Sequence, residues 1–244
     1  MIRDASYIYN YEIKKDSLGD LVILMGKHVI VDLEFCNVTK LQKNKQYKLG
    51  SEIIQIGAVL LDEDDNEIDS FSTYIAPEYG RIDSFIRDLT GIKDFDLKDA
   101  PKLCEALDMF MAWVPNDAVA VSWSHTDDKH LAKEVKVKGL EIEGLPELLE
   151  TWEDCQQTFS EKMGSKDAYN LTEALNIADI SYDDGAHDGL VDARNTARLY
   201  AKMQREEELT LNRYYMEAAG LVEKEDDDFG LDWTKILAGI NLPE

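Results

Sequence analysis

The segment HVIVDLEF, residues 28–35, constrains the fold more than any other, because it reads as a buried strand that carries two acids. Its apolar residues favour β-structure, but Asp32 and Glu34 interrupt them two residues apart. Side chains at positions i and i+2 of a strand project from the same face of the sheet. Burying an unpaired charge costs several kcal/mol. A strand of this kind therefore needs something that neutralises both carboxylates.

Strand and helix patterns alternate along the rest of the chain. Strands are expected at 28–35, 52–61, 67–76 and 118–123, the second and third forming a hairpin around the acidic turn 62–66. Helices are expected at 82–89, 100–114, 127–137, 150–163 and 171–178, and from about 188 past Met203. This order of elements predicts an α/β fold with a mixed β-sheet flanked by helices.

The acidic composition limits how a polyanion could bind. The formal net charge is −24, and residues 205–244 contribute eleven acids against four bases. We expect a domain at 26–208, an N-terminal extension at 1–25 and an acidic, partly helical C-terminal extension at 209–244, with a short docking helix at 231–240. Such a chain repels bulk nucleic acid. A polyanionic substrate would have to be drawn in by bound cations or by a local basic patch.

Membrane and export signals are not evident in the sequence. No apolar run of about 18 residues predicts a membrane span, and the N-terminal residues lack the apolar core of a signal peptide. The three cysteines are far apart, without the spacing of a zinc site or a disulfide framework. We therefore expect free thiols, no membrane partner and a cytoplasmic location.

A second chemical motif lies in AHDGLVDA, residues 186–193, at the start of the last long helix. His187 and Asp192 are five residues apart, so the helix can project Asp192 from its first turns while His187 stays just outside it. A histidine titrates near neutrality and can accept a proton from water. The acids of the first strand suit Mg²⁺ or Mn²⁺, which prefer carboxylate oxygens.

Together these motifs resemble the DEDDh branch of the DnaQ-like 3′–5′ exonucleases, and in particular the RNase T and inhibitor-of-sporulation-type exonucleases. The D-x-E motif of that family is matched by Asp32 and Glu34, and its H-x(4)-D motif by His187 and Asp192. The resemblance runs from about residue 28 to 204, in the family's order.

The segments between the two motifs are also similar to this family. Residues 52–62 resemble its second strand, and residues 88–92 its L-T-G-I turn. The remaining acid of the family is expected within 121–131, where Asp127 lies four residues after a tryptophan and four before a leucine. Asp128 is the alternative assignment.

The resemblance implies an RNase H-like fold and a two-metal mechanism. Two Mg²⁺ or Mn²⁺ ions would be held by four carboxylates, those of Asp32, Glu34, Asp127 and Asp192, with His187 as the general base. The expected activity is hydrolysis of the terminal phosphodiester of single-stranded RNA or DNA, or of short oligonucleotides, which releases nucleoside 5′-monophosphates. The alternatives are a catalytically silent scaffold of the same fold and a phosphohydrolase of small nucleotides.

Two groups of residues are candidates for substrate binding. The stretch 36–50 contains no acid and four lysines, Lys40, Lys43, Lys45 and Lys48, which would contact phosphates. The alternative is a mobile basic surface loop. Leu33 and Phe35, beside the first motif, would contact the terminal nucleotide, as the resemblance implies; Leu33 would equally suit the core, because position i+1 of a strand faces the opposite side.

Overall fold

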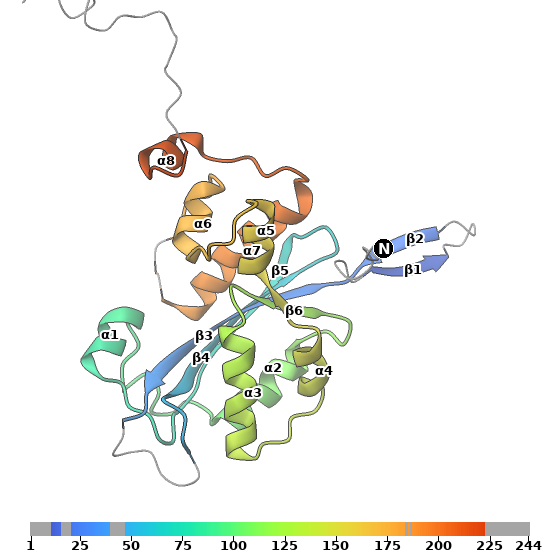
Figure 1. Cartoon of the computed structure of the whole chain (residues 1–244). Coiled ribbons are helices and arrows are strands. Elements are labelled where there is room, and N and C mark those ends of the chain that lie inside the picture. The colour runs from blue at the N-terminus through green and yellow to red at the C-terminus, as the bar shows by residue number, and fades with distance from the viewer. Residues whose placement is uncertain (1–10, 16–20, 40–46, 184, 186, 223–244) are drawn as a thin grey trace, which may run out of the picture.

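A mixed five-stranded sheet forms the centre of the fold in the computed structural model, which describes residues 11–15, 21–39, 47–183, 185 and 187–222 (Figure 1). The strand order is β5-β4-β3-β6-β7. The strands are β3 (His28–Asn37), β4 (Ser51–Leu61), β5 (Glu67–Tyr74), β6 (Val119–Ser122) and β7 (Glu153–Asp154). Strands β3, β4 and β5 are antiparallel, whereas β6 and β7 run parallel to β3. The predicted mixed α/β sheet is confirmed.

Alternate residues of β3 bury into two separate cores, one on each face of the sheet. Val29, Val31 and Leu33 pack with α2 (Leu103–Trp113), α3 (Thr126–Lys138) and α4 (Leu145–Glu150). Ile30 packs on the other face, where the core is completed by α5 (Cys155–Lys162), α6 (Leu171–Ile177) and α7 (Gly189–Arg205). Figure 1 shows these two groups of helices on opposite sides of the sheet. The period of two in the strand therefore directs Asp32 and Glu34 toward α7.

Smaller elements surround this framework. Asp83 is the N-cap of helix α1 (Ser84–Thr90), because its carboxylate accepts the Ile86 N–H at 2.9 Å. The helix covers the end of the sheet through a small apolar cluster. Helix α8 (Arg213–Ala218) packs on α6. Strands β1 (Tyr11–Lys15) and β2 (Leu21–Met25) pair antiparallel in a separate two-stranded sheet, which was not predicted from the sequence. Residues 223–244, with the expected docking helix, lie outside the described residues.

The helix predicted at 150–163 is confirmed only from Cys155 onward, as α5. Helix α4 ends at Glu150, the chain extends at 153–154 as the edge strand β7, and α5 begins only at Cys155. Trp152 causes the break, because its ring is buried and its Nε1–H donates to Ser122 Oγ at 2.9 Å. Pro101 lies just before α2, whose N-cap is Lys102.

A buried ion cluster ties the far end of α3 to the sheet. Lys138 Nζ lies 2.7 Å from Glu52 Oε1 and 3.1 Å from Glu134 Oε1, and both glutamates are fully buried. Although burial alone would lower the pKa of Lys138, the hydrogen bond to Glu52 and the charge of Glu134 raise it above its usual range. The cluster therefore remains charged, and it fixes the C-terminal end of α3.

Within the described ranges, no helix combines the length and the apolar character that crossing a bilayer would need.

Candidate active site

Strand β3 presents two carboxylates to the first turn of α7. Glu34 is buried at 7% exposure, and Asp32 is half-buried. Across the antiparallel ladder, Asp32 lies opposite Gly57 and Glu34 opposite Gln55 of β4. The register shifts immediately after Glu34, so the strand bends at the site. These acids therefore lie in the middle of the sheet, where water alone does not solvate them.

The start of α7 lies directly against this part of the sheet. Asp188 caps the helix, because its Oδ1 accepts the N–H groups of Leu190 at 3.0 Å and Val191 at 3.2 Å. A Cβ atom at Gly57 would come within 2.1 Å of the carbonyl carbon of Gly189, so these two glycines allow backbone to meet backbone. The contact brings the residues around the helix start over β3.

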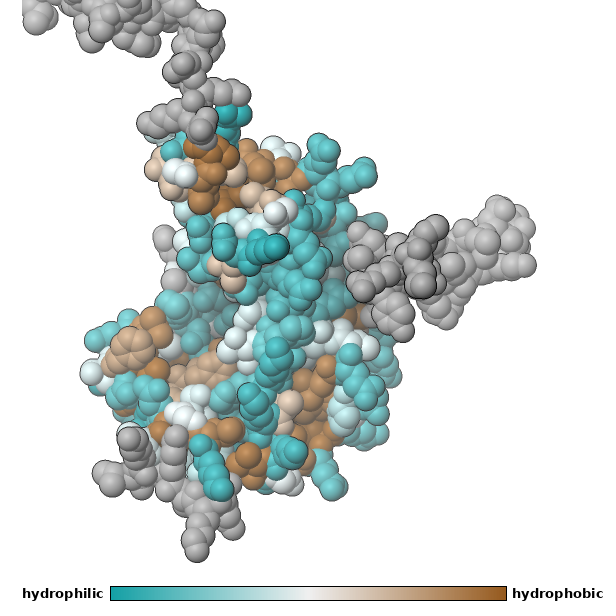
Figure 2. Space-filling view, viewed as in Figure 1, coloured by the Kyte–Doolittle hydropathy of each residue, from teal (hydrophilic) through white to brown (hydrophobic). Residues whose placement is uncertain are grey.

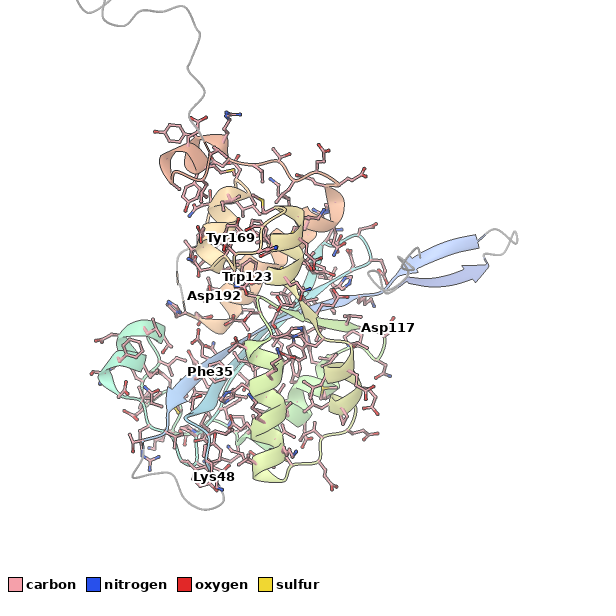
Figure 3. All side chains as sticks on the ribbon, in the orientation of Figure 1. Phe35, Lys48, Asp117, Trp123, Tyr169 and Asp192 are labelled. Atoms are coloured by element: carbon pink, nitrogen blue, oxygen red, sulfur yellow. The ribbon has the colours of Figure 1, made fainter. Side chains whose placement is uncertain are left out.

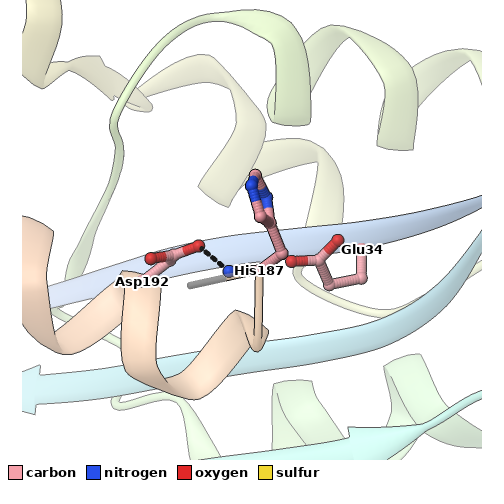
Figure 4. Close-up of side chains that lie close together, drawn as sticks. All are labelled: Glu34, His187 and Asp192. Atoms are coloured by element: carbon pink, nitrogen blue, oxygen red, sulfur yellow. Dashed lines mark hydrogen bonds between the residues drawn. The ribbon is translucent and has the colours of Figure 1, made fainter. Parts of the chain in front are cut away.

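His187 and Asp192 approach Glu34 from this helix start. The His187 N–H donates to Asp192 Oδ2 at 2.9 Å, and the Tyr182 hydroxyl donates to Oδ1. One ligand atom from each of Glu34, His187 and Asp192 lies within 4.8 Å of the others (Figure 4). His187 is exposed, and its backbone has a positive φ of 65°.

The first turn of α3 brings Asp127 to the same cluster. Asp127 is buried, at 8% exposure, and its charge raises the pKa of both Asp32 and Glu34. The neighbouring Asp128 is half-buried, and its Oδ2 lies 3.1 Å from His125 Nδ1. Of the two neighbouring acids, Asp127 is thus the more buried and the one whose charge acts on Asp32 and Glu34.

The cluster is electrostatically strained. Burial, followed by the charges of Asp127 and Glu34, raises the pKa of Asp32 well above its usual range. Burial and the charge of Asp192 raise the pKa of Glu34 to about 8, and burial with the charge of Asp128 raises that of Asp127 to about 8. Divalent cations would relieve this repulsion, and a set of carboxylate oxygens suits Mg²⁺ or Mn²⁺. The residues thus fit the expected ions.

The residues predicted to bind substrate lie in different places. Leu33 is in the core at 5% exposure, which was the alternative for this residue, whereas Phe35 is half-buried with its ring 4.6 Å from that of His130. Figure 2 shows a recess between α1 and α3, and Phe35 lies along it in Figure 3. Lys48 is exposed at the end of the sheet, apart from Asp192 in Figure 3. Lys40, Lys43 and Lys45 lie outside the described residues.

Two residues at the site escaped the sequence analysis. Asp188 adds a fifth carboxylate, whose charge raises the pKa of Asp32 and Glu34. Its position just before a predicted helix is a signal for an N-cap, so it was detectable. Tyr182, ten residues before Asp192 in a loop, carries no such signal.

Comparison with known proteins identifies relatives among nucleases and polymerases. The RNase T family model, described as "Exonuclease", matches residues 29–200. The chain is 27% identical over 180 residues to DNA polymerase III PolC-type from Caldanaerobacter subterraneus subsp. tengcongensis, 30% over 177 to ERI1 exoribonuclease 2 from Xenopus laevis and 28% over 178 to 3′-5′ exonuclease Snipper from Drosophila melanogaster. These matches cover 74%, 62% and 64% of this chain, but only 12%, 25% and 62% of those proteins, respectively.

Solved structures share the fold. The nuclease domain of 3′hExo, a DEDDh family member bound to rAMP, superposes with a TM-score of 0.63 at 20% identity, over 77% of this chain and 96% of that one. Escherichia coli exonuclease I in complex with a dA16 oligonucleotide gives a TM-score of 0.57 at 12% identity, over 75% of this chain and 42% of the other. The five-stranded sheet with helices on both faces is therefore the RNase H-like fold of these exonucleases.

Proposed function

Because the chain belongs to the RNase T family of exonucleases, we propose that it is a metal-dependent 3′–5′ exonuclease. Its substrate would be single-stranded RNA or DNA, or a short oligonucleotide, and its product a nucleoside 5′-monophosphate. The observation that carries this proposal is the convergence of acids from β3, α3 and α7 with one exposed histidine.

Four acids would hold the metal: Asp32, Glu34, Asp127 and Asp192. When bound, two Mg²⁺ or Mn²⁺ ions would supply charge stabilisation for the attacking and leaving oxygens of an in-line displacement. The protein provides acids held together by packing, so little reorganisation is needed when the ions bind. Asp188 adds negative charge to the same place and strengthens the attraction for cations.

His187 would act as the general base. It is exposed, and a ring nitrogen lies within 4.8 Å of oxygens of Glu34 and Asp192, so it borders the place where the scissile phosphate would lie. In the reaction it would accept a proton from the attacking water as the new P–O bond forms and the P–O3′ bond breaks. Its backbone N–H, bonded to Asp192, keeps the histidine beside the acids.

The names of the relatives support a nucleic-acid substrate without choosing the sugar. ERI1 exoribonuclease 2 is named for RNA, whereas exonuclease I was solved with a DNA oligonucleotide. We therefore propose single-stranded nucleic acid as the substrate class, with the sugar to be decided by assay.

The lysines of the segment 36–50 are proposed to contact substrate phosphates. Changing Lys40, Lys43, Lys45 and Lys48 to serine should weaken binding and reduce the slope of log affinity against log salt by roughly 0.7 for each lysine that contacts a phosphate. Fluorescence anisotropy of a labelled oligonucleotide between 50 and 200 mM salt, in an Asp32→Ala background that prevents cleavage, measures both. Lys166→Ser is the control. An unchanged slope would mean that the lysines form only a mobile surface loop.

The proposed activity is tested with 5′-labelled single-stranded RNA and DNA of equal sequence, incubated with Mn²⁺, Mg²⁺ or EDTA. We expect a metal-dependent ladder that shortens from the 3′ end, absent with EDTA and absent with Asp32→Ala. The substrate that is degraded faster identifies the preferred sugar. No cleavage of long strands or of dinucleotides would refute the exonuclease and favour a scaffold role.

A further inference from the structure

Gln55 of β4 is a buried polar residue beside the carboxylates. Its side chain is 2% exposed, and it lies opposite Glu34 in the antiparallel ladder. Cross-strand partners project from the same face of a sheet. The amide of Gln55 therefore points to the site face, toward the start of α7.

The amide of Gln55 contacts the helix start with both of its ends. Its Oε1 accepts the N–H of Gly189, the first residue of α7, at 3.2 Å. Its Nε2 lies 3.5 Å from Oδ2 of Asp188, the N-cap, and 3.4 Å from Ser72 Oγ on β5. The first N–H groups of a helix have no partner within the helix. Gln55 supplies one such partner from a neighbouring strand.

The close contact of Gly189 with the sheet backbone, together with its hydrogen bond to Gln55, restricts where the start of α7 can lie. A Cβ atom on Gly189 would lie 3.2 Å from the Asp32 carbonyl oxygen and 3.2 Å from the Gly57 nitrogen, so the helix start rests on the sheet backbone. The glycines set how closely the helix approaches, while Gln55 sets where along the strand it begins. Asp192 follows Gly189 by three residues on the same rigid helix, and His187 lies two residues before Gly189.

We propose that Gln55 is a positioning residue of the nuclease site: it holds the first turn of α7, and through it the placement of His187 and Asp192 relative to Glu34. The inference rests on the proposed exonuclease function. Gln55 contacts neither the ions nor the substrate in this role. Loss of its amide would let the helix start shift along β4 and widen the spacing of the ligand atoms.

The test compares Gln55→Met, which keeps the side-chain length but cannot hydrogen bond, with Ser72→Ala, which removes only the contact on the β5 side. Gln55→Asn is a second variant, polar but one methylene too short to reach Gly189, in case methionine prevents folding. We expect kcat to fall about tenfold or more in both Gln55 variants, with KM changed by less than about threefold. Ser72→Ala should remain within about threefold of the wild type in both parameters.

Titration of each protein with Mn²⁺ alone, well below its melting temperature, separates positioning from stability. We expect weaker Mn²⁺ binding in the Gln55 variants and faster amide hydrogen exchange at Gly189. Wild-type kcat and Mn²⁺ affinity in Gln55→Met or Gln55→Asn would overturn the inference. If the wild type cleaves no nucleic acid, the proposed function fails, while the Mn²⁺ titration and the exchange rates still decide the role of Gln55.

Discussion

Replacing Asp127 by asparagine is expected to lower kcat about a thousandfold or more, whereas the same replacement at Asp128 should change kcat by less than about fivefold. Asp127 is buried and acts electrostatically on both Asp32 and Glu34. Its amide would remove one anionic metal ligand from the set. Asp128 is directed instead to His125, 3.1 Å away, so its loss leaves the proposed ligand set complete.

The pair is informative because the two acids are adjacent in sequence and in the same helical turn. Single-turnover cleavage of a labelled oligonucleotide at saturating Mn²⁺ measures the effect on the chemical step. Circular dichroism confirms that both variants are folded. If the loss occurs at Asp128 and spares Asp127, the assignment of the fourth carboxylate is reversed.

Glu34→Gln should stabilise the protein in EDTA, by an amount that grows with pH. The pKa of Glu34 is raised from 4.5 to about 8, so the folded state holds its proton more tightly than the unfolded state. The contribution of this carboxyl group to the free energy of unfolding is therefore fully present below about pH 4.5 and is lost as the pH rises to about 8. Glutamine cannot ionise and avoids the loss. Since one pKa unit corresponds to about 1.4 kcal/mol, a shift from 4.5 to about 8 corresponds to roughly 5 kcal/mol, and we expect Tm to rise by roughly 10 °C at pH 8.5.

Thermal unfolding of the wild type and of Glu34→Gln, in EDTA from pH 4.5 to 9, measures this difference. His28, whose pKa burial lowers to about 4, also affects stability in acid, but it is common to both proteins and cancels in the difference. In saturating Mn²⁺ the order should reverse, because the wild type gains more from the bound ions. A difference in Tm that is independent of pH would contradict the repulsion between these acids.

The local features of the site were predictable from the sequence. The period of two in β3, the two acids within it and the start of the helix at 188 are each encoded within a few residues, and the structure brings those segments together. Asp127 also lies where the pattern placed it, at the beginning of α3. Such patterns predict which residues share a face of a strand or helix, whereas the position of Asp127 came from the family resemblance.

The remaining features depend on contacts between distant segments. The break between α4 and α5 follows from the burial of Trp152 against Ser122, thirty residues earlier. Lys138 follows the helix expected at 127–137, and it is buried against Glu52, which lies 86 residues away in the sequence. The link between Gln55 and Gly189 spans 134 residues. The spacing of residues within one segment does not reveal these contacts between distant segments.

The buried ion cluster at the far end of α3 also has a mechanical consequence. Without cations, the ionised acids push Asp127 and its helix away from β3, but Lys138 anchors the opposite end of that helix to β4. The ion pair therefore keeps α3 from moving away from β3, and the repulsion between the acids persists until cations bind. Binding of cations would relieve this repulsion, so an ion pair eleven residues along α3 from Asp127 would contribute to the affinity for metal.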